Sequence, residues 1–280
     1  MTGAAGYNWG TMRTIMIFAI AAIALPQPCQ AVNFYDGARA SKGLYFLTYT
    51  SLYHADETTD SSARTSISDY DYTRTEELVR FCYYTPKAVL TALLPFGRVR
   101  SGYYDTSSSG TGDVNLGAGF FLPLKTLDIL PMLFVKLPAG EYDSAKSVNY
   151  GTNQYDIKPT VFFYKQVENL SIDAAAKYHF RTENRSTDIS PGNELYLQCL
   201  LGWQVGKIFK LGPSLNWMRS SCQKNNGAKV PDSRRESLSA GADIYLRLKP
   251  ASITLTYLRD VRTKNTTKGN FFQLKTCYKF

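Results

Sequence analysis

The sequence predicts an all-β protein, a single antiparallel transmembrane β-barrel of about twelve strands that follows a cleaved signal peptide. Two observations lead to this prediction. Apolar and polar residues alternate with a period of two, and the segments that do so are joined by short and long connections in turn. Hydrophobic residues make up 44% of the 280 residues, yet no run of about 18 apolar residues is available for a transmembrane helix. The composition therefore excludes a helical membrane protein, and its 14% aromatic residues exclude a disordered chain.

The first residues have the order of a secretory signal. Arg13 precedes an apolar run over residues 15–25, and the segment ends on Cys29-Gln30-Ala31. A basic start, an apolar centre and a small-residue end are typical of signal peptides. We expect residues 1–31 to be removed, with Met1 or Met12 as the start, and residues 32–280 to form the barrel. Whether residues 32–43 fold inward as a plug is left open.

Strict alternation is clearest in Leu170–Arg181. Its even positions are apolar, and its odd positions carry mainly polar or charged residues. A strand places successive side chains on opposite faces, so one face of each such strand is apolar and the other polar. The segments interpreted as strands are Leu44–His54, Thr73–Tyr84, Ala88–Arg98, Asp113–Leu122, Leu127–Leu137, Gln154–Tyr164, Leu170–Arg181, Glu194–Val205, Ile208–Ser220, Ser237–Leu248, Ser252–Asp260 and Phe272–Phe280.

The connections alternate in length along the whole chain. The short ones are Thr85–Lys87, Pro123–Thr126, Lys165–Val167, Gly206–Lys207 and Lys249–Ala251. The long ones are Ala55–Tyr72, Val99–Thr111, Pro138–Asn153, Thr182–Asn193, Ser221–Glu236 and Val261–Gly269. Outer-membrane barrels have short periplasmic turns and longer external loops, whereas a soluble β-rich domain, the alternative, has no reason for this pattern. We therefore expect the apolar faces to meet lipid and the polar faces to line a wet lumen.

Aromatic residues at strand ends are expected to form girdles at the two membrane surfaces. They are Tyr45, Tyr53, Tyr83, Tyr84, Tyr155, Tyr164, Trp203, Trp217, Tyr257 and Tyr278.

The polar faces supply the candidate lumen and selectivity residues. These are Asp113, Asn115, Lys136, Asp156, Lys158, Asp173, Lys177, His179, Arg181, Asp243, Arg247 and Lys275. Their charges have both signs, and Asp156 and Lys158 are expected to face Asp173 and Lys177 on the adjoining strand. Two interpretations stay open: ion pairs that brace the wall, or a filter that selects permeating ions.

Four stretches in order resemble an outer-membrane family associated with the meta-pathway of phenol degradation. They are Thr91–Phe96, Gly110–Gly117, Val135–Tyr142 and Asn149–Gln154. With the last strand they cover nearly the whole mature chain. The resemblance implies a bacterial outer-membrane barrel that moves hydrophobic or aromatic compounds, and it brings no catalytic residues with it. The basic net charge and the many tyrosines depart from the pattern.

Enzyme chemistry is not expected. The two histidines, His54 and His179, are the conceivable partners for a serine nucleophile, but His179 belongs to the lumen face rather than the lipid face where a lipid hydrolase would act. No His or Cys cluster has metal-ligand spacing, and no complete phosphate-loop motif occurs, so neither a metal nor a cofactor is expected. Export permits disulfides, yet the spacing of Cys82, Cys199, Cys222 and Cys277 requires none.

The expected partners follow from the compartment and the charge. The formal net charge of +9 falls to +8 without Arg13, and basic residues gather in the loop that contains Arg219, Lys224, Lys229, Arg234 and Arg235. Lipopolysaccharide phosphates and outer-membrane lipids are expected partners, as are a small-molecule solute and the barrel-assembly machinery, which would read the strand ending at Phe280. Nucleic acid is excluded by the compartment.

The functional prediction is an outer-membrane channel for uptake of small hydrophobic or aromatic compounds by passive or facilitated diffusion. The positive charge supports an alternative, an anion-selective pore for acidic oligosaccharides. A closed structural barrel or a lipid-modifying barrel stays as a third alternative from another class.

Overall fold

The computed structural model describes residues 31–280. The predicted signal peptide lies outside the described residues except for Ala31. Within the described residues, no helix is long and apolar enough to cross a membrane.

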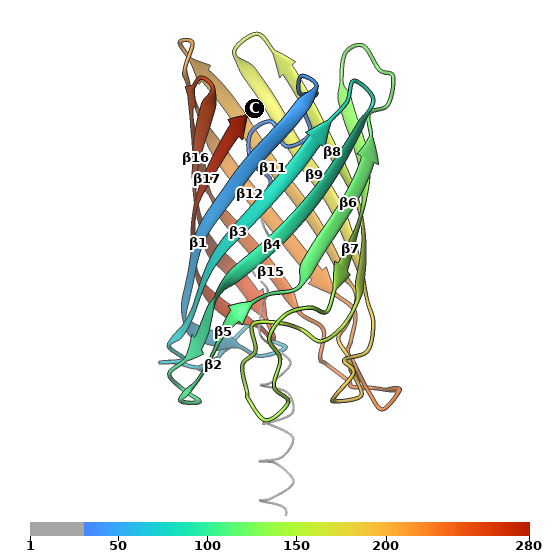
Figure 1. The fold of residues 1–280 in the computed structure, drawn as a ribbon. Helices are drawn as coiled ribbons and strands as arrows, with labels where there is room; N and C mark the ends of the chain where they lie inside the picture. The colour runs from blue at the N-terminus through green and yellow to red at the C-terminus, as the bar shows by residue number, and fades with distance from the viewer. Residues whose placement is uncertain (1–30) are drawn as a thin grey trace, which may run out of the picture.

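The wall of the molecule is one antiparallel sheet whose strands follow their sequence order (Figure 1). All twelve predicted wall strands are present. They are β1 (Gly43–Thr59), β3 (Tyr72–Tyr84), β4 (Ala88–Ser101), β6 (Val114–Phe120), β7 (Asp128–Leu137), β8 (Asp156–Val167), β9 (Leu170–Arg181), β11 (Glu194–Val205), β12 (Phe209–Ser220), β15 (Glu236–Leu248), β16 (Ala251–Lys264) and β17 (Thr267–Lys279).

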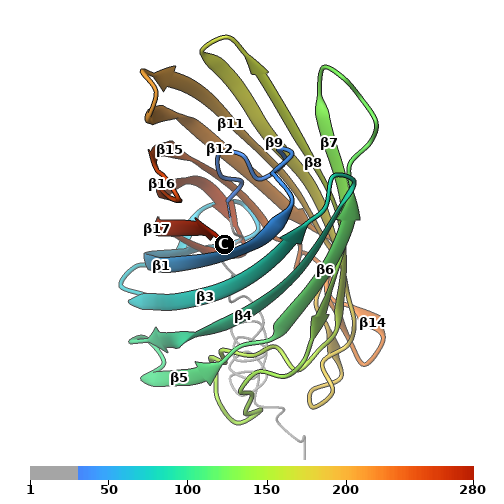
Figure 2. The same cartoon turned by 45° about the horizontal axis from the view of Figure 1, so that its top comes forward.

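The first and last wall strands pair with each other and close the barrel. Their antiparallel register runs from Tyr45 opposite Lys279 to Thr58 opposite Thr267. Figure 2 shows β1 and β17 side by side at this seam. Within residues 31–280, closure gives each of the twelve wall strands a hydrogen-bonded neighbour on both sides, which a sheet needs when it lies in lipid.

Apolar and polar residues that alternate in the sequence lie on opposite faces of the barrel wall. In β9, Leu170 and Ile172 are 63% and 49% exposed on the outer face. Their neighbours Ser171 and Asp173 are 3% and 0% exposed on the inner face. The predicted fold class, a transmembrane barrel with an apolar exterior and a polar interior, is confirmed.

The two ends of the barrel differ as predicted, with one exception. Tight turns lie at the upper end in Figure 1, near the C-terminus, and longer loops lie at the lower end. The upper end is therefore the periplasmic one. The long loops carry the short strands β2 (Thr65–Ile67), β5 (Thr106–Thr111), β10 (Ile189–Ser190), β13 (Lys224–Asn225) and β14 (Ala228–Lys229).

The exception is the last external connection, predicted at Val261–Gly269. It is a two-residue turn, Asn265-Thr266, because β16 and β17 continue beyond their predicted ends. Asn265 has a φ of 50°, a left-handed conformation that asparagine tolerates well.

The predicted aromatic girdles are correct only in part. Exposed girdle members on the outer face are Tyr83, Tyr155, Trp203, Tyr257 and Tyr278. Four others face the lumen: Tyr45, Tyr53, Tyr84 and Tyr164. A position near a strand end does not determine whether a side chain faces lipid or the lumen. Odd or even position along the strand determines it, because successive side chains lie on opposite faces.

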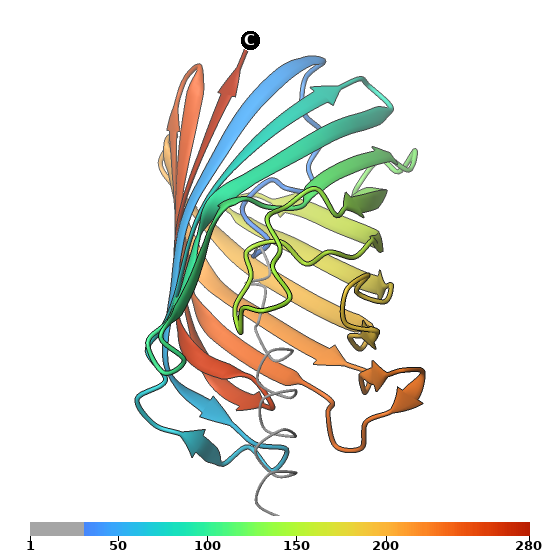
Figure 3. The same cartoon turned by 60° about the horizontal axis from the view of Figure 1, so that its bottom comes forward.

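A plug, defined here as Ala31–Lys42, fills part of the lumen ahead of β1. Figure 3 views the barrel from the loop end and shows this dark-blue segment inside the ring of strands. Phe34 is 2% exposed and belongs to a cluster with wall residues such as Leu130, Phe162 and Leu200. A β carbon on Gly202 would lie 2.5 Å from the Phe34 ring, so the glycine gives this ring its space.

Polar contacts anchor the plug to the wall at several points. The Asn33 side-chain amide donates to the Asp243 carboxylate at 3.2 Å and to the Thr256 hydroxyl at 3.0 Å. The Tyr35 backbone amide donates to Asp173 at 2.6 Å. Near the periplasmic turns, Arg39 Nε lies 2.9 Å from Asp128 Oδ1. These anchors are spread along the plug, so it is held along its length.

We expect Asn33→Ala to loosen the plug without unfolding the barrel. The change removes two hydrogen bonds to buried groups, which corresponds to about 1–3 kcal/mol for opening the segment. Trypsin should then cleave after the exposed Arg39 faster than in wild type, with folding monitored by heat-modifiable electrophoresis. Asn169→Ala, in an exposed periplasmic turn, is the matched control. Equal cleavage of the Asn33 variant and wild type would contradict the assigned role.

Candidate solute pathway through the lumen

An external loop enters the lumen from the external end of the barrel, and its Tyr150 shares a buried cluster with Ala31 of the plug. Tyr150, in the connection between β7 and β8, is 1% exposed, and its hydroxyl donates to Glu76 at 3.1 Å. The Arg74 guanidinium lies 4.6 Å from the centre of its ring. Burial raises the pKa of Tyr150 above its usual range, so this phenol stays neutral and remains a hydrogen-bond donor.

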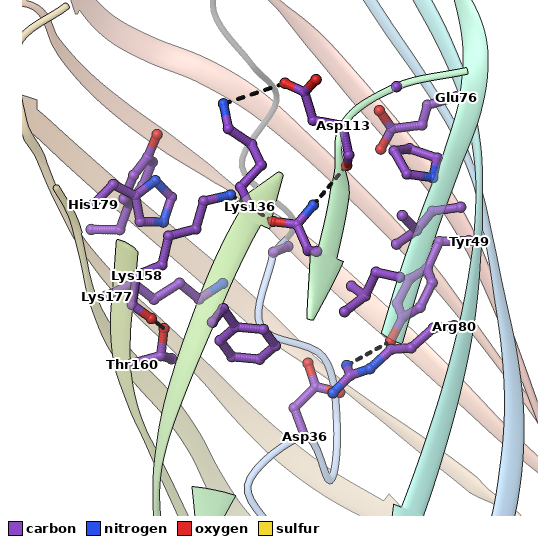
Figure 4. Close-up of a pocket in the computed structure, with 18 of the residues that line it drawn as sticks. Asp36, Tyr49, Glu76, Arg80, Asp113, Lys136, Lys158, Thr160, Lys177 and His179 are labelled. Atoms are coloured by element: carbon purple, nitrogen blue, oxygen red, sulfur yellow. Dashed lines mark hydrogen bonds and ion pairs between the residues drawn. The ribbon is translucent and has the colours of Figure 1, made fainter. Parts of the chain in front are cut away.

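A central cavity of about 160 Å³ lies between the plug and this loop (Figure 4). Ala31 and Asp36 of the plug line it on one side and Tyr150 of the loop on another. Its charged lining has five cations, Arg74, Arg80, Lys136, Lys158 and Lys177, and three carboxylates, Asp36, Glu76 and Asp113. The lining is thus mixed in sign with an excess of positive charge.

Lys136 is the centre of an ion-pair network on one side of the cavity. Its ammonium lies 2.9 Å from Asp156 and 3.5 Å from Asp113, and its side chain is 2% exposed. Lys158 lies 4.0 Å from Asp156 and donates to the Asn115 side chain at 2.9 Å. Buried charges of this kind are tolerated when they are paired and hydrogen-bonded.

The expected pairing of Asp156 and Lys158 with Asp173 and Lys177 is not formed. Asp156 lies opposite Arg181, and Asp173 lies opposite Tyr164. The register between β8 and β9 therefore separates the predicted partners, and Asp156 pairs with the strand on its other side instead.

Glu194 is the centre of a second network toward the external end. Its carboxylate pairs with Arg181 at 2.9 Å, with Arg235, and with His179 at 3.7 Å. His179 also packs against the Tyr196 ring at 4.7 Å between centroids. Arg235 was expected on an outward basic loop, but it is 8% exposed and turned into the barrel, because the buried Glu194 carboxylate attracts it. It therefore does not contribute to an external site for lipopolysaccharide.

Four further predicted lumen residues contact the plug. Asp173 and Asp243 accept its hydrogen bonds, Lys275 pairs with Asp36, and Arg247 donates to the Tyr35 hydroxyl at 3.4 Å. The twelve predicted residues thus lie on the inner face: seven belong to the two wall networks, four contact the plug, and Lys177 lines the central cavity.

Several lumen residues were not predicted, although the alternating pattern of the sequence would have placed some of them on the inner face. Arg74, Glu76 and Arg80 occupy alternate positions of the predicted strand Thr73–Tyr84, and parity alone would have placed them inside. Lys210, which is 0% exposed, donates to Ser171 at 3.0 Å and lies 4.2 Å from the Tyr35 ring centre. Tyr150 and Asp36 belong to segments without periodicity, so no pattern could have identified them.

Three cavities follow one another through the barrel. An outer cavity near the external turn of β16 and β17 shares Tyr196 with the central cavity. The central cavity shares Asp36 and Arg80 with a periplasmic cavity that reaches Ser41 and Lys279. The three cavities therefore lie in series, with Asp36 and Arg80 at the boundary between the central and the periplasmic cavity.

Over residues 31–280, no group of three or more His, Cys, Asp or Glu side chains could hold a metal ion. The cysteines Cys82, Cys199, Cys222 and Cys277 are all free thiols.

The fold is that of bacterial outer-membrane channels and porins. The COG4313 outer membrane channel from Pseudomonas putida F1 is 18% identical, with a TM-score of 0.80 over 91% of this chain and 100% of that one. The NanC porin is 10% identical, with a TM-score of 0.52 over 84% of this chain and 100% of that one. The translocator domain of the autotransporter NalP from Neisseria meningitidis is 10% identical, with a TM-score of 0.55 over 97% and 96%.

No curated protein matches the chain in sequence. A family model does match, over residues 55–276, which includes all wall strands from the end of β1 to most of β17. The chain therefore belongs to the family described as "Putative MetA-pathway of phenol degradation".

Proposed function

We propose that the protein is a passive outer-membrane channel through which small hydrophobic or aromatic compounds cross the lumen. The observation that carries this proposal is the series of three cavities along the barrel axis, which share Tyr196 at one boundary and Asp36 and Arg80 at the other. Diffusion along such a path needs no energy source and no chemical step. The family and the fold of its structural neighbours support a channel role.

The lining of the central cavity favours aromatic solutes. Aromatic rings contribute to it from four wall strands and the external loop: Tyr49, Phe134, Phe162, Tyr196 and Tyr150. Rings bind other rings through offset or edge contacts worth about 0.5–1.5 kcal/mol each, which is enough to retain a solute without trapping it.

A second candidate function is selection of anions, such as acidic oligosaccharides. The central cavity carries five cations against three carboxylates, so its field attracts negative solutes. The first candidate function depends on the aromatic rings of the lining, and the second depends on its charges. The two can therefore be tested separately.

Phe162→Ala should reduce selective passage of aromatic solutes. Phe162 is 6% exposed on the lumen side, whereas Phe163 follows it on the outer face and provides a matched control. In proteoliposomes we expect the ratio of phenol flux to flux of a small neutral sugar to fall severalfold in Phe162→Ala and to stay unchanged in Phe163→Ala. Folded protein that passes neither solute would refute the channel itself.

Lys177→Glu should weaken any anion preference. The change converts five cations against three carboxylates into four of each, so the reversal potential in a salt gradient should shift toward zero. Lys207→Glu makes the same charge change in an exposed periplasmic turn and should leave the potential close to that of wild type. An identical potential in all three proteins would remove the second candidate.

A further inference from the structure

The Asp36 carboxylate of the plug is bound by groups that could equally bind the carboxylate of a small molecule. Its Oδ1 lies 2.5 Å from the Lys275 ammonium, and its Oδ2 accepts the Asn33 backbone amide at 3.0 Å. The side chains of Lys275 and Asp36 are only 8% and 13% exposed. A cation and a backbone N–H that converge on one carboxylate form a strong, charge-assisted contact.

A second cation, Arg80, lies at the boundary between the central and the periplasmic cavity. No carboxylate of the barrel wall in residues 31–280 pairs with it. Arg80 donates to the hydroxyls of Thr91 at 3.0 Å and Tyr49 at 3.3 Å, which are neutral partners. Figure 4 draws Asp36 and Arg80 at the same end of the central cavity, and both line the periplasmic cavity as well. A solute that moves from the central cavity to the periplasmic cavity would pass these two side chains.

We propose that Lys275 and Arg80 form a carboxylate-binding site that Asp36 occupies, and that permeating carboxylates displace Asp36 from it. The plug then acts as a tethered substitute for the solute. This proposal rests on the channel function and assigns it a substrate class: small molecules with one carboxylate on an aromatic or aliphatic body.

The surroundings of the site fit the apolar part of such a molecule. Tyr49 lies beside both cations, with its ring centre 5.6 Å from the Lys275 ammonium. It belongs to a buried cluster with Leu78 and Leu93, and both leucines line the central cavity. A ring or alkyl chain attached to the incoming carboxylate would lie against these side chains.

Exchange of one carboxylate for another also avoids a large electrostatic barrier. Removing Asp36 alone would leave a buried ammonium without a counter-ion, which is strongly unfavourable. An incoming carboxylate compensates Lys275 as Asp36 leaves. The Asn33 anchor and the Arg39 anchor lie on either side of Asp36, so release of Asp36 moves the turn between them, including the hydrogen bond of the Tyr35 backbone amide to Asp173.

Binding of benzoate to the detergent-solubilised folded barrel tests the site directly. A tethered competitor lowers the apparent affinity by the fraction of time that the site is free. We expect Asp36→Asn to bind benzoate roughly tenfold to hundredfold more tightly than wild type by isothermal titration calorimetry. Benzamide, the neutral analogue, should bind weakly to both. Adding Lys275→Met to Asp36→Asn should abolish the gain.

Asp128→Asn is the matched control. It loosens the plug at its Arg39 anchor but keeps Asp36 in place, so its benzoate affinity should stay within a few-fold of that of wild type. Unchanged affinity in Asp36→Asn, or an equal gain in Asp128→Asn, would overturn the proposal.

Planar-bilayer recordings separate this proposal from the channel function. Benzoate should raise the open probability of the wild type, benzamide should not, and Asp36→Asn should be open without either compound. A conducting wild type that treats benzoate and benzamide alike would overturn the displacement mechanism and leave the channel intact. A folded wild type without any conductance would refute the channel, while the calorimetry would still decide the site.

Discussion

Pairing of β1 with β17 is the constraint on which the rest of the structure depends. A strand edge in lipid would leave backbone N–H and C=O groups without partners, at several kcal/mol for each group. Closing the sheet removes that cost and divides every strand into an outer and an inner face. The outer face needs only apolar side chains, as on β9, while the inner face must satisfy its polar groups inside an enclosed space.

That enclosed space explains the density of charge in the lumen. Lys136 with its two aspartates and Glu194 with its arginines are buried networks in which each charge has a partner. The plug extends the same principle, because Asn33 and Tyr35 supply donors to Asp243 and Asp173 on the wall. The buried ion pairs brace the wall, and whether the charged residues around the central cavity also select permeating ions is what the reversal-potential measurement tests.

The fold could be predicted almost entirely from the sequence, because a two-residue period and the lengths of connections are local properties. The lumen residues could be predicted for the same reason, since parity decides which side a residue faces. Their partners could not, because pairing depends on register between strands: Asp156 meets Lys136 rather than residues of β9. Tyr150 and Asp36 could not be found either. They lie in irregular segments that enter the lumen through tertiary contacts, and such segments carry no periodic signal.

The plug is tethered where it joins β1, at the periplasmic mouth, and this has a kinetic consequence. The chain between Ala31 and Gly43 can extend to roughly 40 Å at most. A released plug therefore stays within that radius of its own pore, at an effective concentration in the millimolar range. Under the proposed displacement, reclosure is then a first-order process whose rate is independent of how many copies the membrane holds.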